Sequence, residues 1–214
     1  MQNKIVVGFL IVVAMFLVAG CGNKEIDNEK ESKAGNILNA NNNGEILVVY
    51  FSKTGENYNV GTVNVGNTAM VASYIKEYLN AASFEIVPVN KYPDSYDECL
   101  KVATKEKEED ARPDIKNKLD DISKYDTIFI GYPIWWGEIP QIVYTFMEEY
   151  DLSGKKVIPF NTHEGSGDAG TYTTLKSKLK DSDVNTNGLA ITGSRARTDD
   201  GKEETIKWLR ELGY

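Results

Sequence analysis

The chain has 214 residues, of which 41% are hydrophobic and 26% charged, as in ordinary globular proteins. This length suffices for one domain with a full core plus an appendage. The formal net charge of −8 argues against a nucleic-acid-binding protein, because such proteins need basic patches to meet the phosphates.

The first residues have the pattern of an export signal. Lys4 precedes an apolar run over residues 5–18, which has the length of a signal peptide and is short for a membrane-spanning helix. The segment Val18-Ala19-Gly20-Cys21 resembles the lipobox of bacterial lipoproteins, with valine in place of the usual leucine. The resemblance implies that Cys21 carries lipid and becomes the mature N-terminus, and the alternative is an uncleaved membrane anchor. Both predict a cell-membrane protein on the extracytoplasmic face.

A polar segment separates this signal from the rest of the chain. Residues 22–44 are rich in Asn, Lys, Glu, Ser and Gly, cannot bury a core, and are predicted to be a flexible tether. The chain therefore divides into a signal peptide with lipobox at 1–21, the tether at 22–44 and a domain at 45–214. Lipidation of Cys21 would leave Cys99 without a cysteine to pair with. Cys99 lies in a polar helical stretch without a nearby histidine, so a catalytic thiol is not expected.

Strands and helices alternate along residues 45–214. An unbroken apolar run predicts a first buried strand over 46–51, and apolar residues at helical spacing predict a helix over 68–81. Further strands are predicted at 84–89, 127–131, 157–161 and 187–191, and further helices at 96–110, 139–150, 171–179 and 203–212. This alternation predicts an α/β fold with a doubly wound, five-stranded parallel sheet.

Three of the predicted strands end in turns that carry potential ligand-binding groups. The first turn offers the side-chain donors of Ser52, Thr54 and Asn57, and Gly55 allows close backbone approach. The next two turns, at 132–140 and 162–168, bring two tryptophans and a Gly/Ser loop of free amides. Because the carboxyl ends of parallel strands lie at one edge of the sheet, the three turns are expected side by side. They suit a ligand with a phosphate at one end and a flat aromatic system at the other, although the first turn is also compatible with an ordinary strand-to-helix connection.

The three turns together resemble the flavin loops of the flavodoxin-like family, specifically of bacterial short-chain flavodoxin-domain lipoproteins. Residues 52–57 (Ser-Lys-Thr-Gly-Glu-Asn) are similar to the first phosphate loop, 131–137 (Gly-Tyr-Pro-Ile-Trp-Trp-Gly) to the second flavin loop, and 160–167 (Phe-Asn-Thr-His-Glu-Gly-Ser-Gly) to the third. The resemblance covers residues 45–214 and implies non-covalently bound FMN and strand order 2-1-3-4-5. The chain departs from the pattern at Asn57, where many members have threonine, and in the extra residues 58–66 before the helix.

The resemblance also implies which residues contact the cofactor. The set consists of Ser52, Lys53, Thr54, Gly55, Asn57, Pro133, Ile134, Trp135, Trp136, Gly137, Thr162, His163, Glu164, Gly165, Ser166 and Gly167. Lys53 either contacts the phosphate or only shields its charge. One of the two tryptophans is expected in the core and the other on the flavin. Gly137 allows a neighbouring peptide to turn its carbonyl towards flavin N5 at low cost. His163, the only histidine, makes no metal site. It is either a backbone-bonded loop residue or the candidate catalytic donor to the flavin or to a quinone oxygen.

The resemblance leaves more than one function open. The first is a membrane-tethered electron carrier that docks a redox partner protein. The alternative is an FMN-dependent NAD(P)H:quinone-type oxidoreductase with a small quinone-like acceptor, and a third possibility is a flavin-free interaction domain. The G-x-G-x-x-G spacing at residues 165–170 is weak support for a nicotinamide site, because it does not follow the first strand. The sequence leaves the oligomeric state open.

Overall fold

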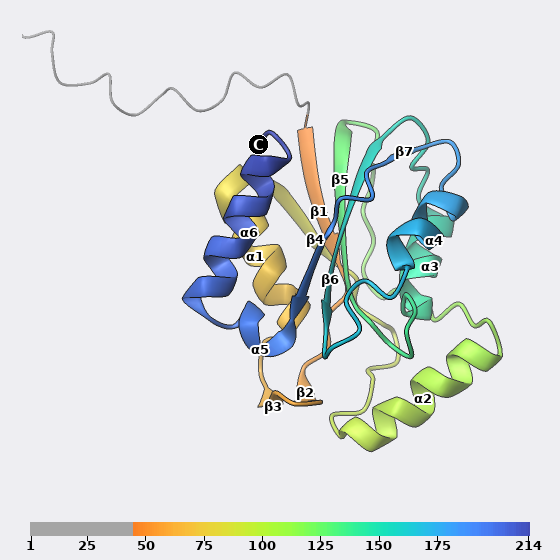
Figure 1. Ribbon diagram of the computed structural model, residues 1–214. Helices are drawn as coiled ribbons and strands as arrows, with labels where there is room; N and C mark the ends of the chain where they lie inside the picture. The colour runs from red at the N-terminus through yellow and green to blue at the C-terminus, as the bar shows by residue number, and fades with distance from the viewer. Residues whose placement is uncertain (1–44) are drawn as a thin grey trace, which may run out of the picture. The chain divides into compact units, whose positions relative to one another are not determined.

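A parallel sheet forms the centre of the domain in the computed structural model, which describes residues 45–214. The strand order is β4-β1-β5-β6, and both β7 and β8 pair with β6 at the far edge (Figure 1). The strands are β1 (Glu45–Tyr50), β4 (Ala82–Glu85), β5 (Tyr125–Pro133), β6 (Lys156–His163), β7 (Asp183–Val184) and β8 (Leu189–Thr192). The predicted α/β fold is confirmed. The predicted signal peptide, Cys21 and the tether lie outside the described residues.

Helices cover both faces of this sheet, as Figure 1 shows. On one face, α1 (Asn67–Leu79) and α6 (Asp199–Glu211) pack side chains such as Ile75 and Leu209 against Phe129 of β5. On the other, α3 (Gln141–Glu149) and α4 (Thr171–Lys178) pack Phe146 and Leu175 against the opposite side of the sheet. The strands are apolar on both sides because both faces are covered. No helix among residues 45–214 is long and apolar enough to cross a membrane.

Two predicted strands differ in the structure. The second was expected over 84–89, but β4 ends at Glu85 and the chain then pairs with a different segment, through an antiparallel bridge between Pro88 and Ile115. A proline cannot donate to a sheet ladder, so the parallel pairing stops before it. The fifth, expected over 187–191, is β8 at Leu189–Thr192, and the two-residue strand β7 before it was not predicted. The last helix begins at Asp199 rather than at 203, because the Thr198 side chain accepts a hydrogen bond from the Gly201 N–H.

The long first turn contains a hairpin that the sequence did not predict. Strands β2 (Gly55–Asn57) and β3 (Gly61–Val63) pair antiparallel. The hairpin contacts the start of α2 (Tyr96–Glu108): the Glu56 N–H donates to the Asp94 carbonyl at 2.7 Å, and the Tyr96 N–H donates to the Glu56 carboxylate at 2.9 Å. The hairpin and α2 therefore lie together at the end of the sheet where β1 finishes (Figure 1).

Candidate functional site

A single pocket gathers the carboxyl ends of β1, β5 and β6. Its volume is about 800 Å³ counted out to its open mouth. The three expected turns all contribute to it, and α1, α2 and the hairpin complete the walls. The lining consists of Ser52, Lys53, Glu56, Asn57, Tyr58, Asn67, Thr68, Tyr96, Cys99, Leu100, Ala103, Pro133, Ile134, Trp135, Trp136, Thr162, His163 and Glu164.

Lys53 is held within its own loop. Its ammonium donates to the backbone carbonyls of Thr54 at 3.0 Å, Glu56 at 2.8 Å and Asp94 at 3.2 Å. An ammonium has three N–H donors, so all of them are engaged. Burial lowers the pKa of Lys53, and the nearby carboxylates oppose that shift. Of the two roles considered for Lys53, the geometry favours local loop support over a phosphate contact.

Asn57 and Gly55 also support the loop. The Asn57 side-chain amide donates to the carbonyls of Gly55 at 3.0 Å and Lys53 at 3.4 Å, whereas a bond to a phosphate was expected. Gly55 has φ +81°, and a Cβ there would lie 2.7 Å from the Asp94 carbonyl oxygen. Glycine is thus required at this position by the contact between the hairpin and Asp94. Thr54 is exposed and does not line the pocket.

The second half of the first turn lies after the hairpin, at Gly66-Asn67-Thr68. The Ser52 hydroxyl accepts a hydrogen bond from the Ala69 N–H at 3.0 Å, which joins the end of β1 to the first turn of α1. A Cβ at Gly66 would lie 2.2 Å from the Ser52 hydroxyl oxygen, so only glycine permits this approach. Apart from Ser52, no described side chain accepts a hydrogen bond from the first N–H groups of α1. Its first N–H groups and its dipole therefore favour an anion beside Ser52.

Asn67 and Thr68 were not predicted as site residues. The Thr68 and Thr162 hydroxyls lie 2.8 Å apart, so the first and third turns are hydrogen-bonded to each other. Arg197 donates to the Asn67 side-chain oxygen at 3.2 Å and to the Val65 carbonyl at 2.8 Å. The sequence signal was Gly-Asn-Thr directly before an amphipathic helix, hidden because the hairpin separates it from Ser52.

The second turn holds the two tryptophans in different environments. Trp135 packs edge-on against Phe51 and Tyr92, with ring centroids 5.3 and 4.9 Å away. Trp136 is 52% exposed. Trp135 is therefore partly buried against the core and Trp136 is exposed, but both line the pocket, and the expectation that only one of them contacts the flavin stays a prediction.

A two-residue hairpin turn sets the direction of Trp136. Trp135 and Glu138 exchange backbone hydrogen bonds of 3.1 and 2.9 Å, and the two residues between them, Trp136 and Gly137, have φ +53° and +71°. Positive φ at both positions is typical of a type I′ turn and is unfavourable for a tryptophan. Lys107 of α2 supports the turn: its ammonium donates to the Trp136 carbonyl at 3.3 Å and pairs with the Glu138 carboxylate at 3.2 Å.

The third turn is fixed from beneath by buried polar groups. The Asn161 side-chain N–H donates to the Gly167 carbonyl at 3.1 Å. The Tyr172 hydroxyl donates to the side-chain oxygen of Asn161. The Tyr132 hydroxyl donates to Thr171 at 3.0 Å, and Thr171 donates to the Asp168 carbonyl at 2.6 Å. A loop rich in glycine is thereby held in one conformation.

His163 and Glu164 form the pocket side of this turn. His163 accepts a hydrogen bond from the Gly165 N–H on Nδ1 at 2.9 Å, so it is bonded to the backbone as one interpretation expected. Acceptance at Nδ1 places the proton of a neutral ring on Nε2, which stays a donor. The Glu164 carboxylate accepts from the Gly193 N–H at 3.0 Å, and burial raises the pKa of Glu164.

The predicted site residues divide into those that line the pocket and those that support it. Ten of the sixteen predicted contacts line the pocket, and Thr54, Gly55, Gly137, Gly165, Ser166 and Gly167 do not. Eight lining residues were not predicted: Glu56, Tyr58, Asn67, Thr68, Tyr96, Cys99, Leu100 and Ala103. Half of these unpredicted residues lie on α2, a helix that no sequence motif connected with the site.

Comparisons with known proteins agree with this arrangement. The sequence matches the flavodoxin family over residues 45–211. A structure from Bacteroides eggerthii DSM 20697, assigned as a flavoprotein, is 31% identical with a TM-score of 0.63, and the match covers 80% of this chain and 99% of that one. A similarly assigned protein from Bacteroides uniformis ATCC 8492 is 29% identical with a TM-score of 0.62, over 78% and 98% of the chains.

A third solved structure extends the fold comparison. A flavoprotein from Lactobacillus acidophilus NCFM, solved in complex with FMN, is 20% identical with a TM-score of 0.53, over 78% of this chain and 99% of that one. Among curated proteins, no sequence matches the chain.

Proposed function

The chain belongs to the flavodoxin family, and we propose that it binds FMN non-covalently in this pocket and transfers electrons through it. The observation that carries the proposal is the convergence of the turns after β1, β5 and β6 on one pocket with a polar end and an aromatic end. The more similar Bacteroides protein, assigned as a flavoprotein, supports the same cofactor class.

The polar end fits a phosphate. The N-terminus of α1, the Ser52 hydroxyl that accepts from its Ala69 N–H, and the Thr68 hydroxyl all lie at this end of the pocket, and Gly66 has no Cβ to displace the Ser52 hydroxyl. Helix N-terminal N–H groups and hydroxyls bind phosphate without a metal or a free cation. This suits a loop whose lysine is already engaged by carbonyls.

The aromatic end fits a flat ring system. Trp136 presents an exposed ring at the pocket mouth, and the Nε2 of His163 is available as a donor on the wall formed by the third turn. Aromatic packing and apolar burial bind such a ring and influence its reduction potential. When bound, FMN supplies reversible uptake of electrons, and the residues named here bind and orient it.

The test is the visible absorption spectrum of the purified protein after FMN is added and the mixture is desalted. We expect retained flavin bands with FMN and loss of riboflavin, which has no phosphate. Gly66→Ala should abolish retention, because its Cβ would collide with the Ser52 hydroxyl. Gly154→Ala is the control glycine substitution outside the pocket lining: a Cβ there meets no atom within 4 Å, and only its φ of +73° disfavours alanine. A colourless wild-type protein would overturn the proposal and leave the flavin-free interaction domain.

A small-molecule acceptor is the second candidate function. The notable feature is the amount of apolar surface in the pocket, including Tyr58 at 56% exposure and Trp136 at 52%. An electron carrier that only docks a redox partner protein needs no apolar surface inside its pocket. A quinone-type oxidoreductase needs such a surface to hold its acceptor. Oxidation of NAD(P)H with a quinone acceptor by FMN-loaded protein would favour the oxidoreductase; no turnover by the same protein would favour the carrier.

We also propose that the domain is tethered to the outer face of the cytoplasmic membrane through lipid on Cys21. The support is the lipobox resemblance and the tether composition of residues 22–44. Expression of the full chain and of Cys21→Ser, followed by membrane fractionation, tests this. Release of Cys21→Ser into the soluble fraction is expected, and unchanged membrane association would indicate an uncleaved anchor instead.

A further inference from the structure

A cation lies at the start of α1, and it comes from a segment outside the three turns of the pocket. Arg197 directly follows the short helix α5 (Gly193–Ala196), which lies beside the start of α1 (Figure 1). Its Nη1 donates to the Val65 carbonyl at 2.8 Å and to the Asn67 side-chain oxygen at 3.2 Å. These two acceptors flank Gly66, the residue that precedes the first turn of α1.

This position is electrostatically unfavourable for an arginine while no anion is bound. The N-terminus of a helix carries the positive end of the helix dipole, which favours anions and disfavours cations. Arg195 of α5 pairs with the carboxylates of Asp200 and Glu204. Arg197, in contrast, forms no ion pair with a carboxylate of residues 45–214. An anion at the start of α1 would compensate both the dipole and Arg197.

Asn67 connects Arg197 to the pocket. Arginine has no hydrogen-bond acceptor, so only the amide oxygen of Asn67 can face it, and the Nδ2 end of the amide must point the other way. Asn67 is 8% exposed and lines the pocket, and its Nδ2 has no hydrogen-bond partner among the residues that the structure describes. Because buried donors are normally paired, this one is available to a ligand at the N-terminus of α1.

Gly193 leaves the space that the Asn67 amide occupies. A Cβ at Gly193 would lie 2.3 Å from Asn67 Nδ2 and 2.5 Å from the Glu164 carboxylate oxygen Oε1. The backbone there is helical, so the glycine is required by space and not by its conformation. The Gly193 N–H donates to the same Glu164 oxygen at 3.0 Å. Glu164 is thereby bonded to α5 rather than to Asn67, and the Asn67 donor stays free.

We propose that Arg197 is a positioning residue for the FMN phosphate, because it holds the Asn67 amide with its oxygen away from the pocket and its Nδ2 donor towards the phosphate end. The inference rests on the proposed FMN site and adds to it Arg197, which lies outside the pocket lining. Arg197 acts through Asn67 and does not touch the ligand. Without Arg197 the amide is free to turn, and its oxygen would then face the phosphate for part of the time.

The test compares the dissociation constants of FMN and riboflavin for the full chain in detergent, by fluorescence titration. We expect Arg197→Met to weaken FMN binding by about tenfold and riboflavin binding by less than about twofold, because only FMN carries the phosphate. Arg195→Met is the matched control, since it removes the same charge from α5 but loses only the pairs with Asp200 and Glu204. It should leave both dissociation constants within about twofold of wild type.

Variants of Asn67 show whether Arg197 acts through this amide. Asn67→Asp keeps an acceptor for Arg197 but replaces the Nδ2 donor by an oxygen, so it should remove the preference for FMN over riboflavin. This variant leaves Arg197 in place and remains informative even if Arg197→Met fails to fold. Asn67→Ala should weaken FMN binding by about tenfold, and the double variant Arg197→Met/Asn67→Ala should fall close to Asn67→Ala alone. A double variant weakened by the product of the two single losses would overturn the proposal, because Arg197 would then act independently of Asn67.

A measurement without FMN separates this inference from the proposed function. In the ligand-free full chain with isotope-labelled asparagine, the side-chain NMR signal that disappears in Asn67→Ala belongs to Asn67 Nδ2. Its relaxation should show a rigid amide in wild type and a mobile one in Arg197→Met. Equal mobility in the two proteins, equal losses of FMN and riboflavin affinity in Arg197→Met, or a preserved FMN preference in Asn67→Asp would each overturn the positioning role. A wild-type chain that retains no FMN but has a rigid Asn67 amide overturns the proposed function and leaves the orientation of Asn67 by Arg197 intact.

Discussion

The ammonium of Lys53 connects three carbonyl oxygens, two from its own turn and one from Asp94 in front of α2. We expect Lys53→Met to lower the free energy of unfolding by about 1–2 kcal/mol, because the oxygens lose a charged donor but remain near water. The preference for FMN over riboflavin should not change, since no N–H of Lys53 is left for a phosphate. Urea unfolding and flavin titration measure the two effects.

Lys91→Met is the matched control for this substitution. The Lys91–Asp94 pair is 2.7 Å long, but both side chains are mostly exposed, so its removal should change the free energy of unfolding clearly less than Lys53→Met does. If Lys53→Met leaves stability intact and abolishes the preference for FMN, Lys53 is a phosphate ligand after all.

Side-chain roles at the site were predictable only where they depend on local sequence. The sequence placed both tryptophans at the site, and the structure has both in the pocket lining, with Trp135 partly buried and Trp136 exposed. The supporting role of Asn57 did not follow, because its partners become available only when the turn folds back on itself. The same holds for Thr68, whose partner Thr162 is 94 residues away.

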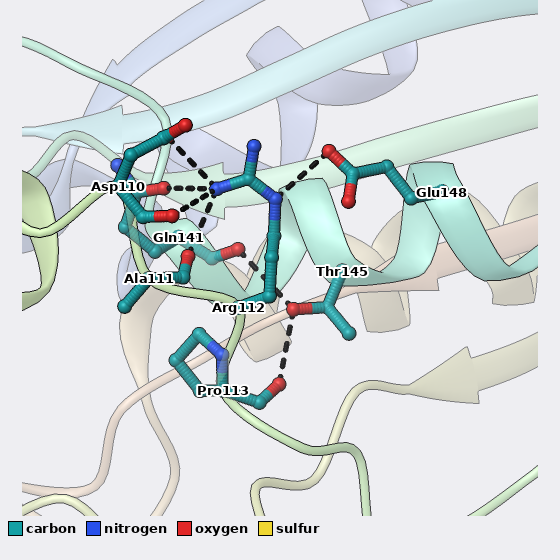
Figure 2. Close-up of polar contacts among 7 residues, drawn as sticks. All are labelled: Asp110, Ala111, Arg112, Pro113, Gln141, Thr145 and Glu148. Atoms are coloured by element: carbon teal, nitrogen blue, oxygen red, sulfur yellow. Dashed lines mark hydrogen bonds and ion pairs between the residues drawn. The ribbon is translucent and has the colours of Figure 1, made fainter.

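At the scale of elements, Arg112 fixes the chain after α2 to α3, near both the first and the last turn of that helix (Figure 2). Its guanidinium donates to the Asp110 carboxylate at 2.9 Å, to Gln141 at 3.0 Å and to Glu148 at 2.8 Å, and it also reaches backbone carbonyls of Asp110 and Ala111. Nη1 shares its N–H groups among four of these acceptors and Nε donates to Glu148, so two nitrogens of one rigid plane are used, which a lysine with a single nitrogen cannot reproduce.

We therefore expect Arg112→Lys to lower the free energy of unfolding by about 1–3 kcal/mol despite conserved charge, because the buried Gln141 side chain loses its partner. Thermal unfolding measures this. The control is Lys118→Ala, which removes an exposed pair with Glu149 and should have a clearly smaller effect. Equal effects would mean that Arg112 is only a surface charge.

Lys107 connects α2 to the turn that carries Trp136. Without its bonds to the Trp136 carbonyl and the Glu138 carboxylate, the positive φ of Trp136 is less well supported. We expect Lys107→Met to weaken FMN binding by roughly fivefold, equivalent to about 1 kcal/mol, with little change in the free energy of unfolding.

Fluorescence titration with FMN tests the effect of Lys107. Lys105→Met is the control on the same helix, because Lys105 pairs only with the exposed Glu109, at 3.9 Å. Identical FMN affinity in Lys107→Met and wild type would show that the turn holds its conformation without α2.

The elements themselves were predictable to different degrees. Helices and strands with strong periodicity were found within a few residues of their predicted positions, since burial on both faces of a sheet leaves a clear apolar pattern. The β2–β3 hairpin was not predicted, because each of its strands has three residues, too few for a recognisable apolar pattern. The contribution of α2 to the site was also not predicted. In the sequence, a strip of Tyr, Cys, Leu and Ala on a charged helix looks the same whether it faces the core or a pocket.

At the scale of the whole molecule, the pocket draws its walls from segments spread between Ser52 and Glu164. A ligand that binds only this folded arrangement must stabilise the whole domain. We expect FMN at 100 times its dissociation constant to raise the free energy of unfolding by about 2.7 kcal/mol and the melting temperature by roughly 5–10 °C. Riboflavin at the same concentration should have a smaller effect, because it lacks the phosphate that the α1 N-terminus attracts.

Thr68 allows this prediction to be traced to the phosphate end of the pocket. Thr68→Ala removes the hydroxyl beside the α1 N-terminus and its bond to Thr162, whereas Thr68→Ser keeps a hydroxyl. In calorimetric melting experiments the difference between FMN and riboflavin should shrink in Thr68→Ala and persist in Thr68→Ser. If riboflavin stabilises the wild-type protein as much as FMN does, phosphate recognition contributes nothing to binding. The assignment of the phosphate site to Ser52, Gly66 and Thr68 would then be wrong.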